Sequence, residues 1–351
     1  MVRARRLMAL MAATALAVSA APLTAASAGP APRAPTGDDR EARSQWALAQ
    51  VGAAQAWART TGAGVRIGIV DTGVDLAHED LAGKIVASTN CIGAAGAQAR
   101  CSGSGQDDNG HGTHVAGIAA AVRGNGVGIA GIAPDAELVV AKVVPSSGLA
   151  TVPDVVAGIK WVVDHGARVV NLSLDASEMT FAGLRATAIQ EGLDYAWARG
   201  AVPVLAAGSP RRLGIGLGSR SDKDLNAVVV GATAVDGHMA AASPPTGDAR
   251  FAVLAPGGSG GTDPATDILS TFWAAGRHDA YEARSGTSAA AAYASGALAL
   301  LLAQGYNALG AVERLLSTAN GTVPCGEGSP DCYGRIDVAA ATAGNVEQSS
   351  R

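Results

Sequence analysis

Three residues that together could perform nucleophilic hydrolysis occur in the order Asp71, His111 and Ser288. A serine attacks a carbonyl efficiently only when a base takes its proton, and the base needs a carboxylate that fixes its tautomer and stabilises its charged form. Asp, His, Ser is one of the known chain orders for such a triad. We therefore expect Asp71 to orient His111, His111 to be the general base, and Ser288 to be the nucleophile.

Each of these residues stands where a secondary-structure element is expected to end or begin. Asp71 follows the β-branched run at residues 65–70 and so lies at the carboxyl edge of a sheet, where sites of α/β proteins assemble. His111 opens a helix. Ser288 lies in the first turn of a buried helix, whose free N–H groups and dipole favour a developing negative charge. The alternative to a catalytic role is a turn-forming aspartate at Asp71 and a helix N-cap at Ser288.

Strand-like and helix-like runs alternate along the chain, which predicts an α/β fold with a mainly parallel, doubly wound sheet and helices on both faces. The segment 84–109 is expected to be a loop. The strand-like runs are residues 138–144, 168–174, 201–206, 227–231 and 251–255. The helix-like runs are residues 154–165, 181–199, 288–304 and 308–317.

Four segments are expected along the chain. Residues 1–28 resemble a secretory signal peptide, with a basic start, an apolar stretch and a small-x-small end, and predict a secreted, extracellular protein. The apolar stretch is too short to be a membrane anchor. Residues 29–45 are expected to be a flexible lead-in, residues 46–340 one catalytic domain, and residues 341–351 a disordered tail.

Charge and cysteine content narrow the classes of function. Without the three arginines of residues 1–28, the chain carries 23 basic and 30 acidic residues, a net charge of −7. This charge argues against a nucleic-acid or anionic-membrane partner. Four cysteines in an exported chain indicate disulfides. Three pairings are possible, and proximity favours Cys91–Cys101 with Cys325–Cys332; a zinc site is the alternative, although no C-x-x-C spacing occurs.

Three sequence blocks resemble the signature blocks of the subtilisin-like serine proteases: IVDTGVD at residues 69–75, NGHGTHVAG at 109–117 and SGTS at 285–288. The resemblance extends over about residues 46–340. It implies a secreted, monomeric serine endopeptidase that cleaves peptide or protein substrates through an acyl-enzyme and needs no cofactor for catalysis. It also implies that His114 is structural, whereas its spacing from His111 alone leaves a metal pair open. His78, His165, His238 and His278 are expected at the surface or in loops.

The chain departs from this family near the expected cleft. The family usually has Asn where Ser209 stands, and Gly where Asp175 stands, so the hole that binds the oxyanion and the pocket before the cut are both expected to differ. A catalytically weak relative that serves as a binding or scaffolding module is therefore the alternative function. The resemblance assigns the oxyanion hole to Ser209 and Ser288, and the substrate cleft to Ser173, Leu174, Asp175, Ala206 and Gly208.

The resemblance also implies a structural calcium site, in which one carboxylate, one amide and backbone carbonyls supply oxygen ligands. A glycine-rich turn without a metal is the alternative for this loop. The implied ligands are Asp80, Val122, Asn125, Val127 and Ile129.

Overall fold

The structure is a computed structural model that describes residues 39–94, 100–174, 179–180, 187–208, 225–244, 246, 249–321 and 334–344. All of them lie within the compact unit Pro32–Arg351. Several sequence predictions fall outside the described residues, namely the signal peptide at 1–28, most of the tail, Asp175, Ser209, Cys325 and Cys332.

A seven-stranded sheet forms the centre of this unit, with the strand order β2-β3-β1-β5-β7-β8-β9, and all of its neighbouring strands run parallel. The predicted parallel α/β sheet is therefore confirmed. Its strands are β1 Arg66–Asp71, β2 Ile85–Asn90, β3 Glu137–Lys142, β5 Ala167–Leu172, β7 Val202–Ala206, β8 Val228–Thr233 and β9 Phe251–Pro256.

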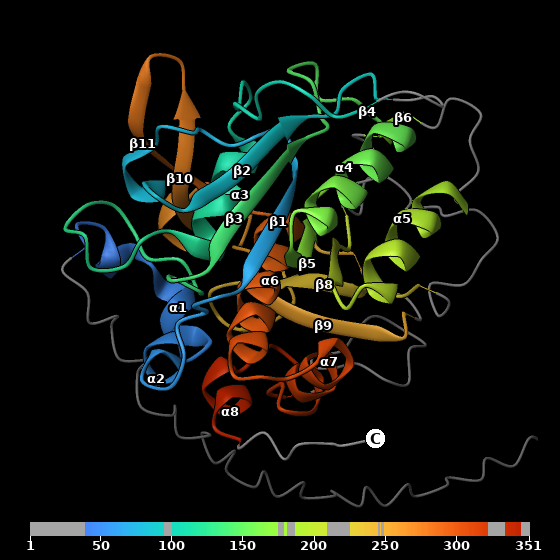
Figure 1. Cartoon of the computed structure of the whole chain (residues 1–351). Coiled ribbons are helices and arrows are strands. Elements are labelled where there is room, and N and C mark those ends of the chain that lie inside the picture. Colours follow the sequence, from blue (N-terminus) through green and yellow to red (C-terminus); the bar gives the residue numbers. More distant parts are fainter. Residues whose placement is uncertain are drawn as a thin grey trace, which may run out of the picture. The chain divides into compact units, whose positions relative to one another are not determined.

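Helices cover both faces of the sheet, because its central strands present apolar side chains alternately to two core clusters. Ile67 and Ile69 of β1 belong to one cluster, and Val70 belongs to the other. Figure 1 shows α4 and α5 together, apart from α3 and α6. The helices are α1 Trp46–Gln50, α2 Ala53–Trp57, α3 His111–Ala120, α4 Val152–Asp164, α5 Thr187–Ala198, α6 Thr287–Ala303, α7 Ala308–Ser317 and α8 Val338–Thr342.

Helix α6 is buried on almost every side, which explains its alanine-rich sequence. A Cβ atom at Gly296 would lie 1.5 Å from a methyl carbon of Ile132, so only glycine permits this contact. No single helix among the described residues is long and apolar enough to cross a membrane. Helices α6 and α7 pass such a test only as a pair bent by 119°.

Two sequence expectations need correction. The segment 84–109 is not all loop, because it contains the edge strand β2. The residues of β2 are half-exposed and partly polar, so they lack the apolar pattern that predicts a strand. The hairpin of β10 (Ile268–Ala274) and β11 (Arg277–Arg284) was also missed, because β11 is rich in charged residues. His78 lies in a loop, as expected, but it is buried, and its Nε2 atom lies 2.9 Å from the Ala280 carbonyl oxygen.

Two smaller features complete the part of the fold that supports the site. The predicted disulfide Cys91–Cys101 is present and closes the segment after β2. The Cys91 amide donates a hydrogen bond to the Lys142 carbonyl (2.8 Å), so the disulfide adjoins the end of β3. A short parallel pair joins β4 (Ala150–Thr151) to β6 (Met179–Thr180).

Candidate active site

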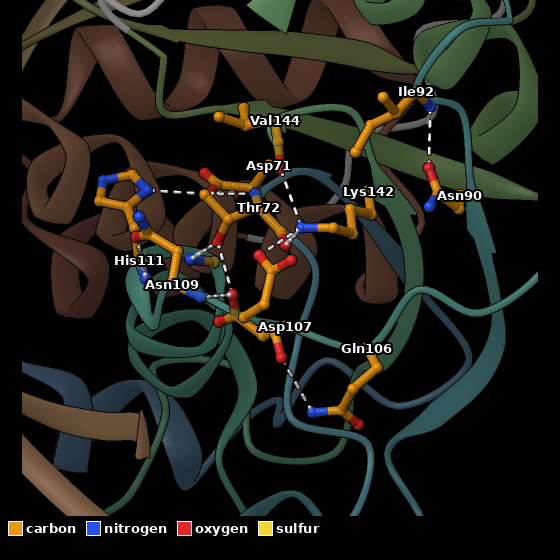
Figure 2. Close-up of polar contacts among 12 residues, drawn as sticks. Asp71, Thr72, Asn90, Ile92, Gln106, Asp107, Asn109, His111, Lys142 and Val144 are labelled. Carbon is orange, nitrogen blue, oxygen red and sulfur yellow. Dashed lines mark hydrogen bonds and ion pairs between the residues drawn. The ribbon is translucent and has the colours of Figure 1, made fainter. Parts of the chain in front are cut away.

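Asp71 and His111 form a hydrogen-bonded pair at the carboxyl edge of the sheet (Figure 2). Asp71 Oδ1 lies 2.7 Å from His111 Nδ1 and also accepts the Thr72 amide at 2.7 Å. Because an ionised carboxylate only accepts hydrogen bonds, Nδ1 carries the proton in this pair. The lone pair of the neutral imidazole is then on Nε2, which is the atom that a general base uses.

The other oxygen of the Asp71 carboxylate is buried as well. Asp71 is fully buried, and its Oδ2 has no hydrogen-bond partner in the described part of the chain. In a site of low dielectric constant, a carboxylate with an unused oxygen interacts strongly with nearby positive charge. The Asp71 carboxylate is therefore placed next to the imidazole that would carry positive charge during base catalysis.

Asp107 holds the loop that precedes His111, and the sequence analysis missed it. Its Oδ1 accepts the Thr72 hydroxyl (2.9 Å) and the Asn109 amide (3.0 Å), as Figure 2 shows. The same oxygen accepts the Gly110 amide (3.1 Å), and Oδ2 accepts both the amide (3.1 Å) and the hydroxyl (2.5 Å) of Thr113. Asp107 therefore ties the start of α3 to the residue after Asp71. An Asp shortly before a helix start is the capping signal that could have revealed it.

Gly112 allows the first turn of α3 to touch the end of β1. A Cβ atom there would lie 2.0 Å from the Gly73 carbonyl oxygen and 3.1 Å from the Asp71 Cβ atom. The Gly112 amide donates to the Thr72 hydroxyl at 2.9 Å. Because real Cβ atoms do not approach a carbonyl oxygen so closely, any other residue would push His111 away from Asp71.

Ser288 is held at the end of β5 by reciprocal hydrogen bonds with Ser173. The Ser288 hydroxyl donates to the Ser173 carbonyl, and the Ser173 hydroxyl donates to the Ser288 carbonyl, both at 2.9 Å. The Asn171 amide group donates to the Ser173 hydroxyl at 2.8 Å, and its oxygen accepts the Ser295 hydroxyl at 2.9 Å. Helix α6 therefore starts at the same sheet edge as α3.

The two helices that carry His111 and Ser288 run side by side from this edge. An added Cβ atom at Gly296 would lie 3.1 Å from the Ala119 carbonyl oxygen, so α6 and α3 are in close contact there. Gly296 is eight residues after Ser288, and Ala119 is eight residues after His111. Each residue adds the same rise to an α-helix, so His111 and Ser288 lie equally far from this contact along their helices. The starts of α3 and α6 are therefore next to each other.

The segment after β7 also reaches the start of α6. The Thr287 hydroxyl donates to the Gly208 carbonyl (3.0 Å) and accepts the Gly208 amide (3.1 Å). Gly208 therefore lies beside Ser288, whereas the next residue, Ser209, is outside the described residues. Leu174 and Ala206 are 3% and 1% exposed as whole residues and belong to the core, so their side chains do not line a cleft.

His114 is buried and joins α3 to the hairpin that leads to Ser288. Its Nε2 atom lies 3.0 Å from the Ile268 carbonyl oxygen and 3.2 Å from that of Glu282. Burial, with a smaller contribution from the neighbouring His111, lowers the pKa of His114 to about 3. A neutral ring whose Nε2–H faces two carbonyls matches the structural role expected from the resemblance, and does not match metal ligation through Nε2.

Two buried carboxylates from other segments, Asp39 and Asp80, contact the expected calcium loop at residues 122–129, and Asp39 was not among the predicted ligands. Burial, with a smaller contribution from the charge of Asp39, raises the pKa of Asp80 to about 6. Asp39 accepts the amides of Gly124 (2.7 Å) and Asn125 (3.1 Å) on Oδ1, and its Oδ2 is buried without a partner among the described residues. It lies within the segment 29–45 assigned to the lead-in, so its burial could not be foreseen from composition.

These groups partly match the donor set of a calcium ion. Two neighbouring buried carboxylates repel each other unless a cation lies between them, and the free Asp39 oxygen would suit one. The Asp80 oxygens accept the Asn125 side-chain amide (2.8 Å) and the Ile129 backbone amide (2.7 Å). Among the described residues, no group of three or more His, Cys, Asp or Glu side chains could hold a metal. Any ion there would therefore depend on amide and carbonyl oxygens as well.

Comparisons with known proteins agree with this geometry. Residues 62–323 match the model of the Subtilase family. Thermitase from Thermoactinomyces vulgaris is 34% identical over 281 residues, which cover 79% of this chain and 90% of thermitase. Subtilisin DY from Bacillus licheniformis is 35% identical over 265 residues, which cover 74% of this chain and 84% of that protein.

Solved structures give the same result. A protease structure from Pseudoalteromonas arctica superposes with a TM-score of 0.69 at 25% identity, covering 88% of this chain and 99% of that one. Fervidolysin from Fervidobacterium pennivorans, a keratinolytic enzyme related to subtilisin, superposes with a TM-score of 0.68 at 25% identity, covering 88% of this chain and 46% of that one.

Proposed function

The chain belongs to the subtilase family and is a serine-type endopeptidase that acts on peptides or proteins, and we propose that it cleaves them with Asp71, His111 and Ser288. The observation that carries this assignment is the 2.7 Å contact between Asp71 and His111 at the sheet edge where α6 begins. The family needs no cofactor for catalysis.

The proposed reaction begins when the Ser288 hydroxyl turns from the Ser173 carbonyl toward His111. Its oxygen attacks the peptide carbonyl carbon while Nε2 of His111 takes the proton, and Asp71 remains ionised and stabilises the imidazolium. The imidazolium then gives its proton to the leaving amine, and the C–N bond breaks to leave an acyl group on Ser288. A water molecule, deprotonated by His111, hydrolyses this ester and restores the serine.

The negative charge on the former carbonyl oxygen needs donors that are in place before the reaction. We assign one donor to the Ser288 backbone amide at the start of α6 and the second to Ser209. The two hydrogen bonds between Gly208 and the Thr287 hydroxyl support this assignment, because they fix the chain immediately before Ser209. A serine hydroxyl is shorter than an asparagine amide, so it reaches the oxyanion less well.

A single substitution tests the oxyanion assignment. In subtilisin itself, loss of the side-chain donor costs about 100- to 1,000-fold in kcat, and this known value sets the scale for the present chain. Ser209→Asn should raise kcat at least about tenfold with little change in KM, because the bond forms mainly in the transition state. An unchanged or lower kcat in a folded variant would assign the hole to another group.

We place the substrate beside the ends of β5 and β7. Ser173 and Gly208, which contact the first residues of α6, would border the cleft, and Leu174 and Ala206 would contribute backbone atoms only. The resemblance assigns the next residue in the sequence, Asp175, to the pocket before the cut, and we propose that its carboxylate either narrows this pocket or favours Lys or Arg there. A cleavage profile on a peptide library tests this, and a preference for large apolar residues that persists in Asp175→Gly would contradict it.

We propose calcium as a structural ion in the loop after α3. Asp39 and Asp80 would supply charge, Asn125 its side-chain oxygen, and Val122, Val127 and Ile129 backbone carbonyls; the uncompensated Asp39 oxygen supports this proposal. Calcium at 100 times its Kd would add about 2.7 kcal/mol to the free energy of unfolding. Asp39→Asn should reduce the calcium-dependent rise in the thermal midpoint, whereas a wild-type midpoint indifferent to calcium and chelator would exclude the site.

We further propose that the enzyme is secreted and acts as a monomer, without nucleic-acid or membrane partners. The signal-like residues 1–28, the Cys91–Cys101 disulfide and the acidic charge support this. Size-exclusion chromatography with light scattering tests the monomer.

Hydrolysis of a peptide nitroanilide by the wild-type protein, lost in Ser288→Ala and in His111→Ala, tests the proposed triad. A catalytically weak relative that binds peptides is the second candidate, and the replacement of Asn by Ser209 favours it. That candidate predicts peptide binding without turnover.

A further inference from the structure

Lys142 is a buried lysine beside Asp71 for which the proposed mechanism has no role. It ends β3, and it is paired in register with Asp71 at the end of the neighbouring parallel strand β1. Its side chain is only 6% exposed. An ammonium group in such a place is costly unless its hydrogen bonds are satisfied, so the partners of Lys142 indicate its purpose.

All three donors of the Lys142 ammonium have acceptors at the edge of the site (Figure 2). Nζ donates to the Thr72 carbonyl (2.6 Å), to Asp108 Oδ1 (2.7 Å) and to the Val144 carbonyl (2.9 Å). The ammonium therefore joins three segments: the residue after Asp71, the loop before His111, and the chain that follows β3.

Each of the first two segments sets the position of one member of the Asp71–His111 pair. The Thr72 amide donates to Asp71 Oδ1, and the Thr72 hydroxyl bonds to Asp107. Asp108 follows Asp107 directly in the loop before His111. The Val143 and Val144 amides donate to the Asp71 carbonyl at 2.8 and 3.2 Å, so the third segment also holds the backbone of Asp71.

We propose that Lys142 is a positioning residue, which fixes the distance and orientation of Asp71 relative to His111 by holding these three segments with one buried charge. Lys142 does not reach the reacting atoms: its ammonium is occupied by Thr72, Asp108 and Val144. The inference rests on the proposed triad, because it assigns Lys142 to the geometry of that triad.

The proposed role predicts a defect in turnover rather than in substrate binding. Loss of the triad carboxylate's function in serine proteases costs about 10⁴ in kcat, which sets the upper limit for any residue that acts through it. A displacement of about 1 Å by a distant change can cost about 100-fold. We expect Lys142→Met, which keeps the apolar stem and removes the charge, to lower kcat between about 10-fold and 100-fold, with KM changed less than about twofold.

Lys84 provides a matched control. It is also buried, and its Nζ donates to the Pro134 carbonyl at 2.6 Å. Its own carbonyl accepts the amide of Leu138 near the start of β3, so it lies at the opposite edge of the sheet from Lys142. Lys84→Met removes a buried ammonium without touching the Asp71 or His111 segments, and we expect its kcat to equal that of the wild type.

The experiment measures kcat per active site, with a serine-directed phosphonate used to count the sites in each sample. The proton NMR spectrum of each protein supplies a second readout, because the proton in the hydrogen bond from His111 Nδ1 to Asp71 resonates far downfield. We expect Lys142→Met to shift or broaden this signal and Lys84→Met to leave it in place. A Lys142→Met protein with wild-type kcat and an unmoved signal overturns the proposal.

The labelling experiment distinguishes failure of the proposed function from failure of the role proposed for Lys142. If the wild-type protein does not react with the phosphonate, the proposed function fails; if wild-type and Lys142→Met proteins react equally fast, only the role of Lys142 fails. Should Lys142→Met not fold, Asp108→Ala takes its place, because Asp108 is half-exposed and its loss removes the charged partner. We expect a smaller fall in kcat there, with a moved downfield signal. If the Asp108→Ala protein has the kcat and the downfield proton signal of the wild type, the proposal is overturned.

Discussion

Acidification should destabilise this protein through His114, and the size of the effect follows from its burial. His114 is 3% exposed and faces the carbonyls of Ile268 and Glu282. Burial lowers its pKa from 6.5 to about 3. Because the pKa is lower in the folded than in the unfolded state, this contribution to stability is complete above pH 6.5 and is lost as the pH falls toward 3.

The magnitude can be worked out from these two pKa values. At pH 5 the unfolded chain binds a proton at His114 and the folded chain does not, which lowers the free energy of unfolding by about 2 kcal/mol relative to pH 8. At pH 4 the loss grows to about 3 kcal/mol by the same relation. His114→Gln keeps a donor near the position of Nε2 but cannot take up a proton, so it should remove this part of the pH dependence.

Urea unfolding at pH 8 and pH 5 measures the effect, in a Ser288→Ala background so that the protein does not digest its own unfolded fraction. The calcium concentration is held constant, because a bound ion would stabilise the folded state by mass action. His165→Gln is the control, because His165 is exposed at the end of α4. If His114→Gln loses as much stability between pH 8 and pH 5 as His165→Gln does, the reasoning from burial is refuted.

Two further predictions test the framework of the site. Gly112→Ala would place a Cβ atom 2.0 Å from the Gly73 carbonyl oxygen, so we expect kcat to fall about 100-fold with KM nearly unchanged; a fall of less than twofold would show that α3 can shift without cost. Replacing Cys91 and Cys101 by serine opens a loop with a sequence separation of 10, which should cost about 2–3 kcal/mol and lower the thermal midpoint by about 3–5 °C. An unchanged midpoint would show that the disulfide does not stabilise the fold.

The sequence predicted the fold and the three proposed triad residues because their signals are local. A β-branched run that ends at Asp71 and a helix that starts at His111 can be recognised within a few residues. The alternation of such runs then predicts a parallel sheet, whose carboxyl edge brings the ends of β1 and β5 together. The resemblance to a protease family added the role of each residue.

The residues that the sequence did not reveal act through contacts between distant segments. In the sequence, Lys142 is a polar residue in a strand-like run with no sign of a special role. Only the register of β3 with β1 places it beside Asp71. Asp39 stands in a charged stretch that suggests a flexible segment, and its burial depends on the loop around Gly124. Strand β2 was missed because an edge strand is only partly buried, which weakens its apolar pattern.

The central claim is that Ser288 is a nucleophile activated by His111, and covalent labelling tests it most directly. The wild-type protein is treated with a fluorophosphonate at neutral pH, and peptide mass spectrometry locates the adduct and gives its stoichiometry. We predict one adduct per molecule, on Ser288, and no adduct in the His111→Ala variant under the same conditions. An unmodified Ser288 in folded wild-type protein, while a control serine protease in the same tube reacts completely, would contradict the claim.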